Sequence, residues 1–129
     1  MDRITLTKPD DWHLHLRGGS AMKSVVGMSA LQMGRGVIMP NLLPPIRDVS
    51  QAIEYHKEIM NALPAETTFS PLMVLYLTDS TTKSEIIAAS EAQEVYAVKL
   101  YPAGATTNSD SGVTNLLSEI GRASCRERV

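Results

Sequence analysis

Apolar residues along this 129-residue chain are grouped into short runs, and between the runs they recur at helical spacing. Short apolar runs bounded by glycine, proline or polar residues are typical of buried strands. We predict strands at residues 11–17, 35–39, 69–77 and 95–101, after a short leading strand at residues 4–6. The spacing between the runs, with its capping residues, predicts three helices: from Ser20 to Gly34, from Asp48 or Ser50 to Pro64, and a shorter one from Thr82 or Ser84.

Strands and helices therefore alternate along the chain. Strands that are continuously hydrophobic favour a parallel sheet that is covered on both faces. The units repeat about every 30 residues, close to the unit length of an eight-fold barrel of roughly 250 residues. We predict an α/β fold, a partial (β/α)8 TIM barrel containing about its first four units. A doubly wound open sheet is the alternative, but Gly18-Gly19 does not form the glycine-rich phosphate turn typical of that fold.

Residues 119–129 do not fit this pattern. They are rich in arginine and hold the only cysteine, Cys125, and no apolar face runs through them. The helix that Val113, Leu116 and Leu117 would begin is cut off there. We expect residues 1–118 to form the barrel part, and residues 119–129 to be foreign sequence from a truncated frame.

The composition is that of an ordinary globular domain with a small-molecule partner. Twelve basic and fourteen acidic residues give a net charge of −2, and no basic run suggests a nucleic-acid or membrane surface. No apolar run is long enough to span a bilayer, and the first residues lack the apolar segment of a secretory signal. We therefore expect a cytoplasmic protein, and the single cysteine fits a reducing compartment.

The first predicted long strand carries the most informative side chains. If residues 11–17 form a strand, His13, His15 and Arg17 project to one side. Its other face would carry the apolar side chains of Trp12, Leu14 and Leu16. Two imidazoles at this spacing can bind one metal ion, and the arginine beside them can bind an anionic ligand. The alternative is a pair of hydrogen-bonded or half-exposed histidines with no metal.

A second informative residue is Lys99, inside the last apolar run. A buried ammonium is costly unless it is paired, deprotonated or modified. Its neutral amine can react with CO₂ to give a carbamate, whose two oxygens can bridge two cations about 3.5–4 Å apart. The alternative is a lysine whose charged end reaches solvent at the end of a strand.

Four separate motifs carry a resemblance to a known family. They are Asp10-Asp11-Trp12-His13-Leu14-His15-Leu16-Arg17, Met39-Pro40-Asn41-Leu42, Tyr76-Leu77-Thr78-Asp79, and Lys99-Leu100-Tyr101-Pro102 with Ala105-Thr106-Thr107-Asn108. In this order and at these intervals they resemble bacterial dihydroorotases of the shorter, homodimeric type, in the amidohydrolase superfamily. The likeness covers residues 3 to about 117. It implies a zinc-dependent enzyme of pyrimidine biosynthesis that interconverts N-carbamoyl-L-aspartate and dihydroorotate.

The resemblance also implies roles for single residues. It matches His13 and His15 to ligands of one zinc ion, and Lys99 to a carboxylated lysine that bridges two zinc ions. It matches Arg17 and Asn41 to residues that hold the substrate carboxylate. The loop that closes over bound substrate is matched by Thr106 and Thr107.

The family pattern is incomplete in this sequence. Two further histidine ligands and a late aspartate, which the resemblance implies as metal ligand and proton shuttle, are absent. His56 lies among charged residues and is expected to be solvated. We therefore expect this chain to be inactive alone and, with two unpaired sheet edges, prone to aggregate. Two alternatives stay open: a cyclic amidohydrolase acting on another ring, such as a hydantoin, and a non-catalytic structural or partner-binding barrel fragment.

Overall fold

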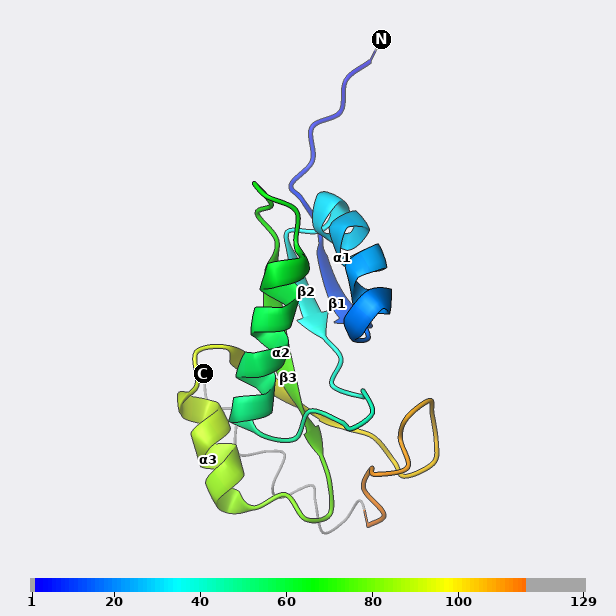
Figure 1. The fold of residues 1–129 in the computed structure, drawn as a ribbon, viewed down its shortest axis with the longest axis vertical. Helices are drawn as coiled ribbons and strands as arrows, with labels where there is room; N and C mark the ends of the chain where they lie inside the picture. Colours follow the sequence, from blue (N-terminus) through cyan, green and yellow to red (C-terminus); the bar gives the residue numbers. More distant parts are fainter. Residues whose placement is uncertain (1, 116–129) are drawn as a thin grey trace.

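A computed structural model describes residues 2–115 of the chain. Strands and helices alternate throughout this part (Figure 1). The elements are β1 (Asp10–Leu14), α1 (Gly19–Gln32), β2 (Arg35–Ile38), α2 (Val49–Ala62), β3 (Ser70–Leu77), α3 (Lys83–Glu91) and β4 (Val95–Leu100). All four predicted long strands and all three predicted helices are present.

The four strands form one parallel sheet in chain order, β1-β2-β3-β4. Parallel neighbours that follow each other in sequence need a crossover, and each crossover here contains one helix. The prediction of an α/β fold with successive β/α units is confirmed. The strands β1 and β4 are the edges of the sheet within the described part of the chain.

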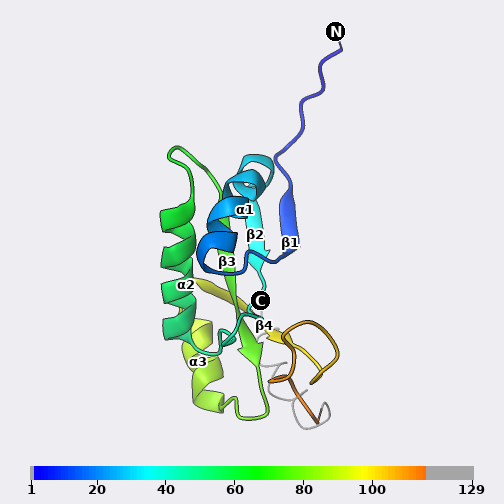
Figure 2. The ribbon, with the colours of Figure 1, turned by 45° about the vertical axis from the view of Figure 1, so that its right-hand side comes forward.

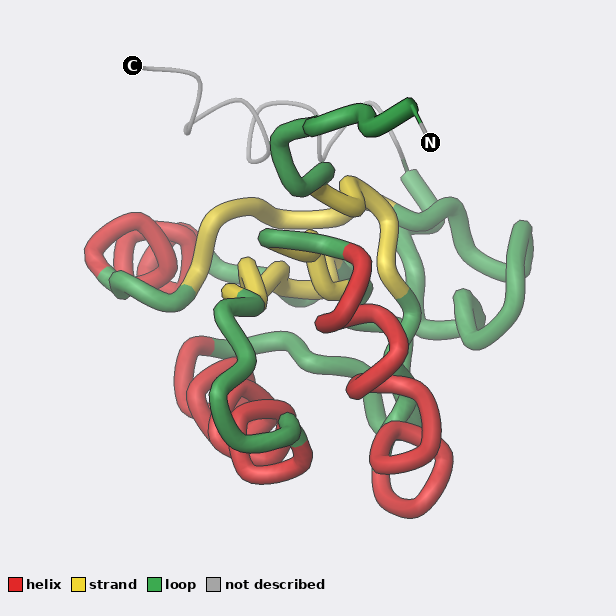
Figure 3. The backbone as a smooth tube through the Cα atoms, turned by 90° about the horizontal axis from the view of Figure 1, so that it is seen from above, coloured by secondary structure: helices red, strands yellow, loops and turns green. Residues whose placement is uncertain are grey.

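The helices pack on one face of the sheet (Figure 2). The predicted cover on both faces holds for β3, where every residue from Pro71 to Leu77 is buried. Seen from above, the helices lie outside the group of strands (Figure 3). One apolar core joins helix residues to alternate strand residues, because successive side chains of a strand face opposite ways. Its most buried members include Met22, Val26, Ala30, Ile38, Ala52, Ile59, Met73, Leu75, Ala89 and Val95.

Close packing within this core requires a glycine at one position of β2. A Cβ atom added at Gly36 would lie 2.8 Å from Phe69 Cζ and 2.9 Å from Leu14 Cδ2. These two apolar side chains therefore occupy the space that a larger residue would need. The short apolar run around Gly36 consequently forms a buried strand although glycine is unfavourable in strands.

The predicted leading strand at residues 4–6 was wrong. These residues form no strand, and Ile4 and Leu6 are 80% and 82% exposed. A strand needs hydrogen bonds from a neighbour, and the edge of the sheet is formed instead by β1, which begins at Asp10. Alternating apolar residues alone could not reveal that no partner strand lies beside them.

The strand β1 contains an irregularity that the sequence pattern did not predict. Asp11 pairs with Gly36 and Leu14 pairs with Ile38, so β1 has one more residue than β2 between these pairs. Strict alternation therefore fails, and Trp12 is 66% exposed instead of packing with the apolar face. Leu14 and the fully buried Leu16 do belong to the core or pack against it, as predicted.

The helix starts follow the capping signals in the sequence. The Asp48 side chain accepts a hydrogen bond from the main-chain N–H of Gln51 and caps α2. Thr82 and Glu85 form a reciprocal capping box at the start of α3. The first helix differs, because its cap is Gly18 rather than Ser20 and no side chain caps it.

After β4 the chain forms a loop whose two ends lie side by side. Pro102 and Val113 form an isolated parallel bridge, and residues between them carry no helix or strand. Val113 therefore does not begin the predicted helix. The predicted boundary between residues 118 and 119 lies outside the described residues. Within residues 2–115, no helix is long and apolar enough to span a membrane.

Candidate metal and substrate site

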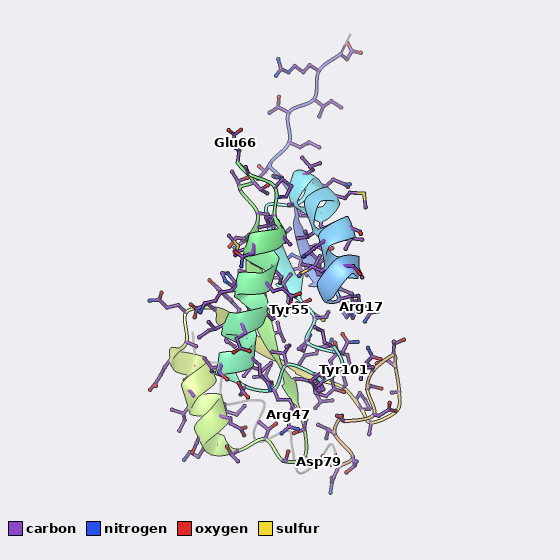
Figure 4. The ribbon with its side chains drawn as sticks, in the orientation of Figure 1. Arg17, Arg47, Tyr55, Glu66, Asp79 and Tyr101 are labelled. Carbon is purple, nitrogen blue, oxygen red and sulfur yellow. The ribbon has the colours of Figure 1, made fainter. Side chains whose placement is uncertain are left out.

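A cleft of about 360 Å³ opens at the carboxyl end of the sheet. Its walls contain all seven residues that the sequence analysis assigned to metal or substrate, together with Leu100, Tyr101 and Pro102. The seven are His13, His15, Arg17, Asn41, Lys99, Thr106 and Thr107. Figure 4 shows Arg17 and Tyr101 on the same side of the molecule. Carboxyl ends of parallel strands are where barrel enzymes carry their sites.

The two histidine rings lie next to each other on the wall of the cleft. His13 Nε2 and His15 Nε2 lie 3.1 Å apart, and the ring centroids are 5.0 Å apart with planes tilted by 50°. Two nitrogens bound to one zinc ion at 2.0–2.1 Å, with angles between 90° and tetrahedral, lie about 2.9–3.3 Å apart. The pair therefore has the spacing of two ligands of one ion.

The same pair could also share a hydrogen bond without any metal. In that case one ring would be the donor and the other the acceptor. Burial lowers the pKa of His15, and the positive charge of Arg17 adds to this, whereas the nearby Asn41 side chain opposes it. The net shift is downward, which keeps the ring neutral and its lone pair available to a cation.

Lys99 lies on the same wall, near the end of β4. Its side chain is only partly buried, and its Nζ lies 5.6 Å from the ring centroid of Tyr101. No carboxylate forms an ion pair with it within residues 2–115. Lys99 is thus less enclosed than the sequence predicted, and its amine faces the cleft without an acidic partner in that part of the chain.

These residues do not complete a metal site by themselves. Within residues 2–115, no group of three His, Cys, Asp or Glu side chains could hold a metal ion. His13 and His15 offer two nitrogens, and Lys99 could add oxygen ligands only as a carbamate. The chemistry and spacing of this partial set fit zinc, with further ligands required from elsewhere.

Arg17 is held in an uncommon backbone conformation at the mouth of the cleft. Its φ is 63°, in the left-handed region, which is uncommon for a residue with a side chain. Its main-chain carbonyl accepts a hydrogen bond of 2.5 Å from the Tyr55 hydroxyl. Tyr55 lies 38 residues further along the chain, so no local pattern in the sequence signals this contact.

Asn41 is buried and bonded to the loop after β4. Its Nδ2 donates to Thr107 O at 2.9 Å, and its own main-chain oxygen accepts from Asn108 Nδ2 at 3.1 Å. Its Oδ1 is buried and has no hydrogen-bond partner among residues 2–115. Buried acceptors are rarely left unpaired, so this oxygen is open to a donor bound in the cleft.

Tyr101 lines the cleft beside Lys99 and stacks on Tyr76, and neither tyrosine was given a role from the sequence. Their rings are stacked with centroids 4.9 Å apart and planes at 19°. Both are buried, and burial raises the pKa of Tyr101, so its hydroxyl stays protonated. Tyr101 is two residues after Lys99, and this same-face spacing is the signal that could have identified it.

Comparison with known proteins gives one consistent result. No family model matches the chain. A protein named dihydroorotase from Ralstonia nicotianae is 59% identical over 116 residues, which are 90% of this chain and 34% of that protein. A dihydroorotase from Microcystis aeruginosa is 54% identical over 129 residues, or 38% of its length. The chain resembles part of a dihydroorotase.

Solved dihydroorotase structures agree with this resemblance. The crystal structure of the Campylobacter jejuni dihydroorotase matches 84% of this chain with a TM-score of 0.76 and 36% identity, over 31% of its own length. The Saccharomyces cerevisiae dihydroorotase, solved with 5-fluoroorotic acid, matches 81% of the chain with a TM-score of 0.72 and 38% identity, over 28% of its length. The chain spans about a third of the length of the dihydroorotases it matches.

Proposed function

We propose that this chain supplies part of the active site of a zinc-dependent cyclic amidohydrolase that interconverts N-carbamoyl-L-aspartate and dihydroorotate. The observation that carries the proposal is the 3.1 Å separation of His13 Nε2 and His15 Nε2, in one cleft with Arg17 and Lys99. High identity to dihydroorotases supports the substrate assignment. We do not expect turnover by the 129-residue chain alone, because the residues that the structure describes, 2–115, make an incomplete ligand set.

In this proposal His13, His15 and a carboxylated Lys99 would hold the zinc. Zinc would supply Lewis-acid polarisation of the ring amide carbonyl. No residue of this chain is proposed as the general acid or base. The proton-transferring group would come from the remaining two-thirds of a full-length dihydroorotase.

Substrate binding is assigned to residues around the metal ligands. The Arg17 guanidinium presents planar N–H donors that match the substrate carboxylate. The left-handed backbone of Arg17 and its hydrogen bond from Tyr55 fix the position of the main chain from which this side chain extends. Asn41 would add a neutral donor from its second Nδ2 hydrogen, since the first is bonded to Thr107. Thr106 and Thr107 would exclude water from the bound ring.

The full-length protein would act on a small molecule as a cytoplasmic homodimer. Nothing in the composition of the 129-residue chain favours a nucleic-acid or membrane surface, since the net charge of this chain is −2. Size-exclusion chromatography with light scattering of the full-length protein would measure the assembly directly.

A chimera tests the proposal directly. The 116 matched residues of this chain would replace the matching segment of the Ralstonia nicotianae dihydroorotase. We expect zinc-dependent conversion of dihydroorotate, lost on Arg17→Ala or Lys99→Ala. Turnover of a hydantoin but not of dihydroorotate would favour a hydantoinase-like activity instead. A folded chimera that binds no zinc would favour a non-catalytic barrel fragment.

A further inference from the structure

The loop at residues 102–112, here called the 102–112 loop, is a preformed unit. Ser109 is fully buried, and its hydroxyl donates to Thr106 O at 2.7 Å and accepts from Thr106 N at 2.8 Å. The main-chain oxygen of Ser109 accepts from Gly104 N and Gly112 N. These bonds lie within the loop, so they fix its shape but not its place over the cleft.

The two ends of the 102–112 loop are also fastened together. Val113 N donates to Tyr101 O at 2.7 Å, and Ala103 N donates to Val113 O at 3.0 Å. A Cβ atom added at Gly112 would lie 2.3 Å from Tyr101 O, so the two backbones approach too closely for a side chain. The base and the internal bonds therefore hold the loop together as one unit.

The tip of the loop is bonded to the segment that follows β2 through one pair of reciprocal hydrogen bonds. Asn41 Nδ2 donates to Thr107 O at 2.9 Å, and Asn108 Nδ2 donates to Asn41 O at 3.1 Å. We call this pair the Asn41–Asn108 clasp. A longer contact of 3.4 Å from the Tyr76 hydroxyl to Asn108 O supports it. The clasp joins residues that are 67 positions apart in the chain.

Asn108 is suited to this role by its backbone as well as its side chain. Its φ is 54°, in the left-handed region, where asparagine is enriched among residues with a side chain. This turn points the amide toward Asn41 rather than toward solvent. The neighbouring Thr106 and Thr107 consequently line the cleft.

We infer that Asn108 is a positioning residue: its hydrogen bond to the Asn41 main chain seats the preformed 102–112 loop over the cleft. One of the two Nδ2 hydrogens of Asn41 is bonded to Thr107 O in this clasp. A substrate carboxylate that binds the other hydrogen therefore shares the Asn41 amide with the loop. Loop position and substrate binding are thereby coupled through Asn41. The coupling to substrate rests on the proposed function, whereas the clasp itself does not.

Two substitutions at Asn108 separate the lost donor from the changed backbone. Asn108→Gly keeps the left-handed φ and removes the amide, and Asn108→Asp keeps the shape of the side chain and removes its donor. Ser111→Ala is the matched control, because Ser111 is an exposed residue of the same loop outside the clasp. Hydrogen exchange of the amides of residues 103–109 would be measured on the chimera, without ligand.

Both Asn108 variants should speed exchange in residues 103–109 by about 2- to 10-fold, the effect of losing one hydrogen bond. Amide exchange in α2 should stay unchanged in both Asn108 variants. Amide exchange in residues 103–109 should stay unchanged in the Ser111→Ala control. Unchanged loop exchange in either Asn108 variant would overturn the inference. In particular, faster exchange in Asn108→Gly alone would assign the effect to backbone freedom rather than to the clasp.

Kinetics of the chimera give a second readout that a merely structural role would not move. If the loop is held over the cleft less often, a smaller fraction of the enzyme molecules can bind substrate. KM should therefore rise by about the same 2- to 10-fold, while kcat stays within about twofold of the unmodified chimera. A fall in kcat at unchanged KM would contradict the inference. If the chimera shows no turnover but loop exchange responds as expected, the proposed function fails and the clasp stands.

Discussion

Tyr55, on the helix α2, donates a hydrogen bond of 2.5 Å to the main-chain carbonyl of Arg17, a residue whose φ is 63°. Burial raises the pKa of the Tyr55 hydroxyl, so it remains a donor across the physiological range. The contact joins the outer helix layer to the mouth of the cleft. Tyr55, a residue of the apolar core, thus helps to fix the main-chain position of Arg17, whose side chain is proposed to bind substrate.

Replacing Tyr55 with phenylalanine should lower the free energy of unfolding. The ring would still pack in the core, but the Arg17 carbonyl would lose its donor, at a cost of about 1–3 kcal/mol. Urea unfolding of the chimera followed by circular dichroism would measure this. Tyr96→Phe is the matched control, because Tyr96 is 56% exposed and should change stability by less than about 0.5 kcal/mol. Equal effects of the two substitutions would contradict the role of the Tyr55 bond.

The Asp48 cap should make stability depend on acid pH. Partial burial raises the pKa of Asp48, but hydrogen bonds from Gln51 N and Ser50 outweigh it, and the folded-state pKa is below its ordinary 3.8. A lowered pKa stabilises the fold above the ordinary value, and the contribution is lost as pH falls through the folded value.

Asp48→Ala should therefore cost about 1 kcal/mol at pH 7, and the difference from the unmodified protein should shrink below about pH 4. Urea unfolding between pH 2.5 and 7 would measure it. Asp2→Ala, at an exposed residue outside any helix, should show no such difference at any pH. A stability difference between Asp48→Ala and the unmodified protein that grows as the pH falls would contradict a lowered pKa of Asp48.

Gly112→Ala should disturb the base of the 102–112 loop. The added methyl group would overlap Tyr101 O, which is backbone and cannot move aside like a flexible side chain. We expect a loss of about 1–3 kcal/mol and faster exchange of the Ala103 and Val113 amides. Gly34→Ala is the control, since a methyl group there would lie 3.7 Å from its nearest neighbours. Similar losses at both glycines would argue against the close approach.

Zinc affinity should depend on the two cleft histidines. In the chimera, His13→Ala and His15→Ala should each weaken zinc binding by at least about tenfold, as lost metal-site residues do. Competition with a zinc-sensitive dye would measure it, and turnover should fall in parallel. His56→Ala is the control, because His56 lies on α2 outside the cleft. Loss of affinity in His56→Ala alone would move the metal site away from the β1 histidines.

Local signals in the sequence determined the order and type of the main elements. The Asp48 cap and the Thr82 capping box act within one helical turn, so they can be identified without a structure. The apolar runs correctly indicated a parallel sheet, because strands buried in such a sheet are hydrophobic along their whole length. The rings of His13 and His15 lie side by side as predicted, although the alternation of β1 fails and the strand ends at Leu14.

The tertiary structure decided what depends on partners distant in sequence. The extra residue in β1 appears only through its register with β2, so the exposure of Trp12 could not be predicted. The hydrogen bonds of Tyr55 to Arg17 and of Asn108 to Asn41 join residues 38 and 67 positions apart. No local period encodes such contacts, because they form only when packing of the helices and closure of the loop bring the segments together.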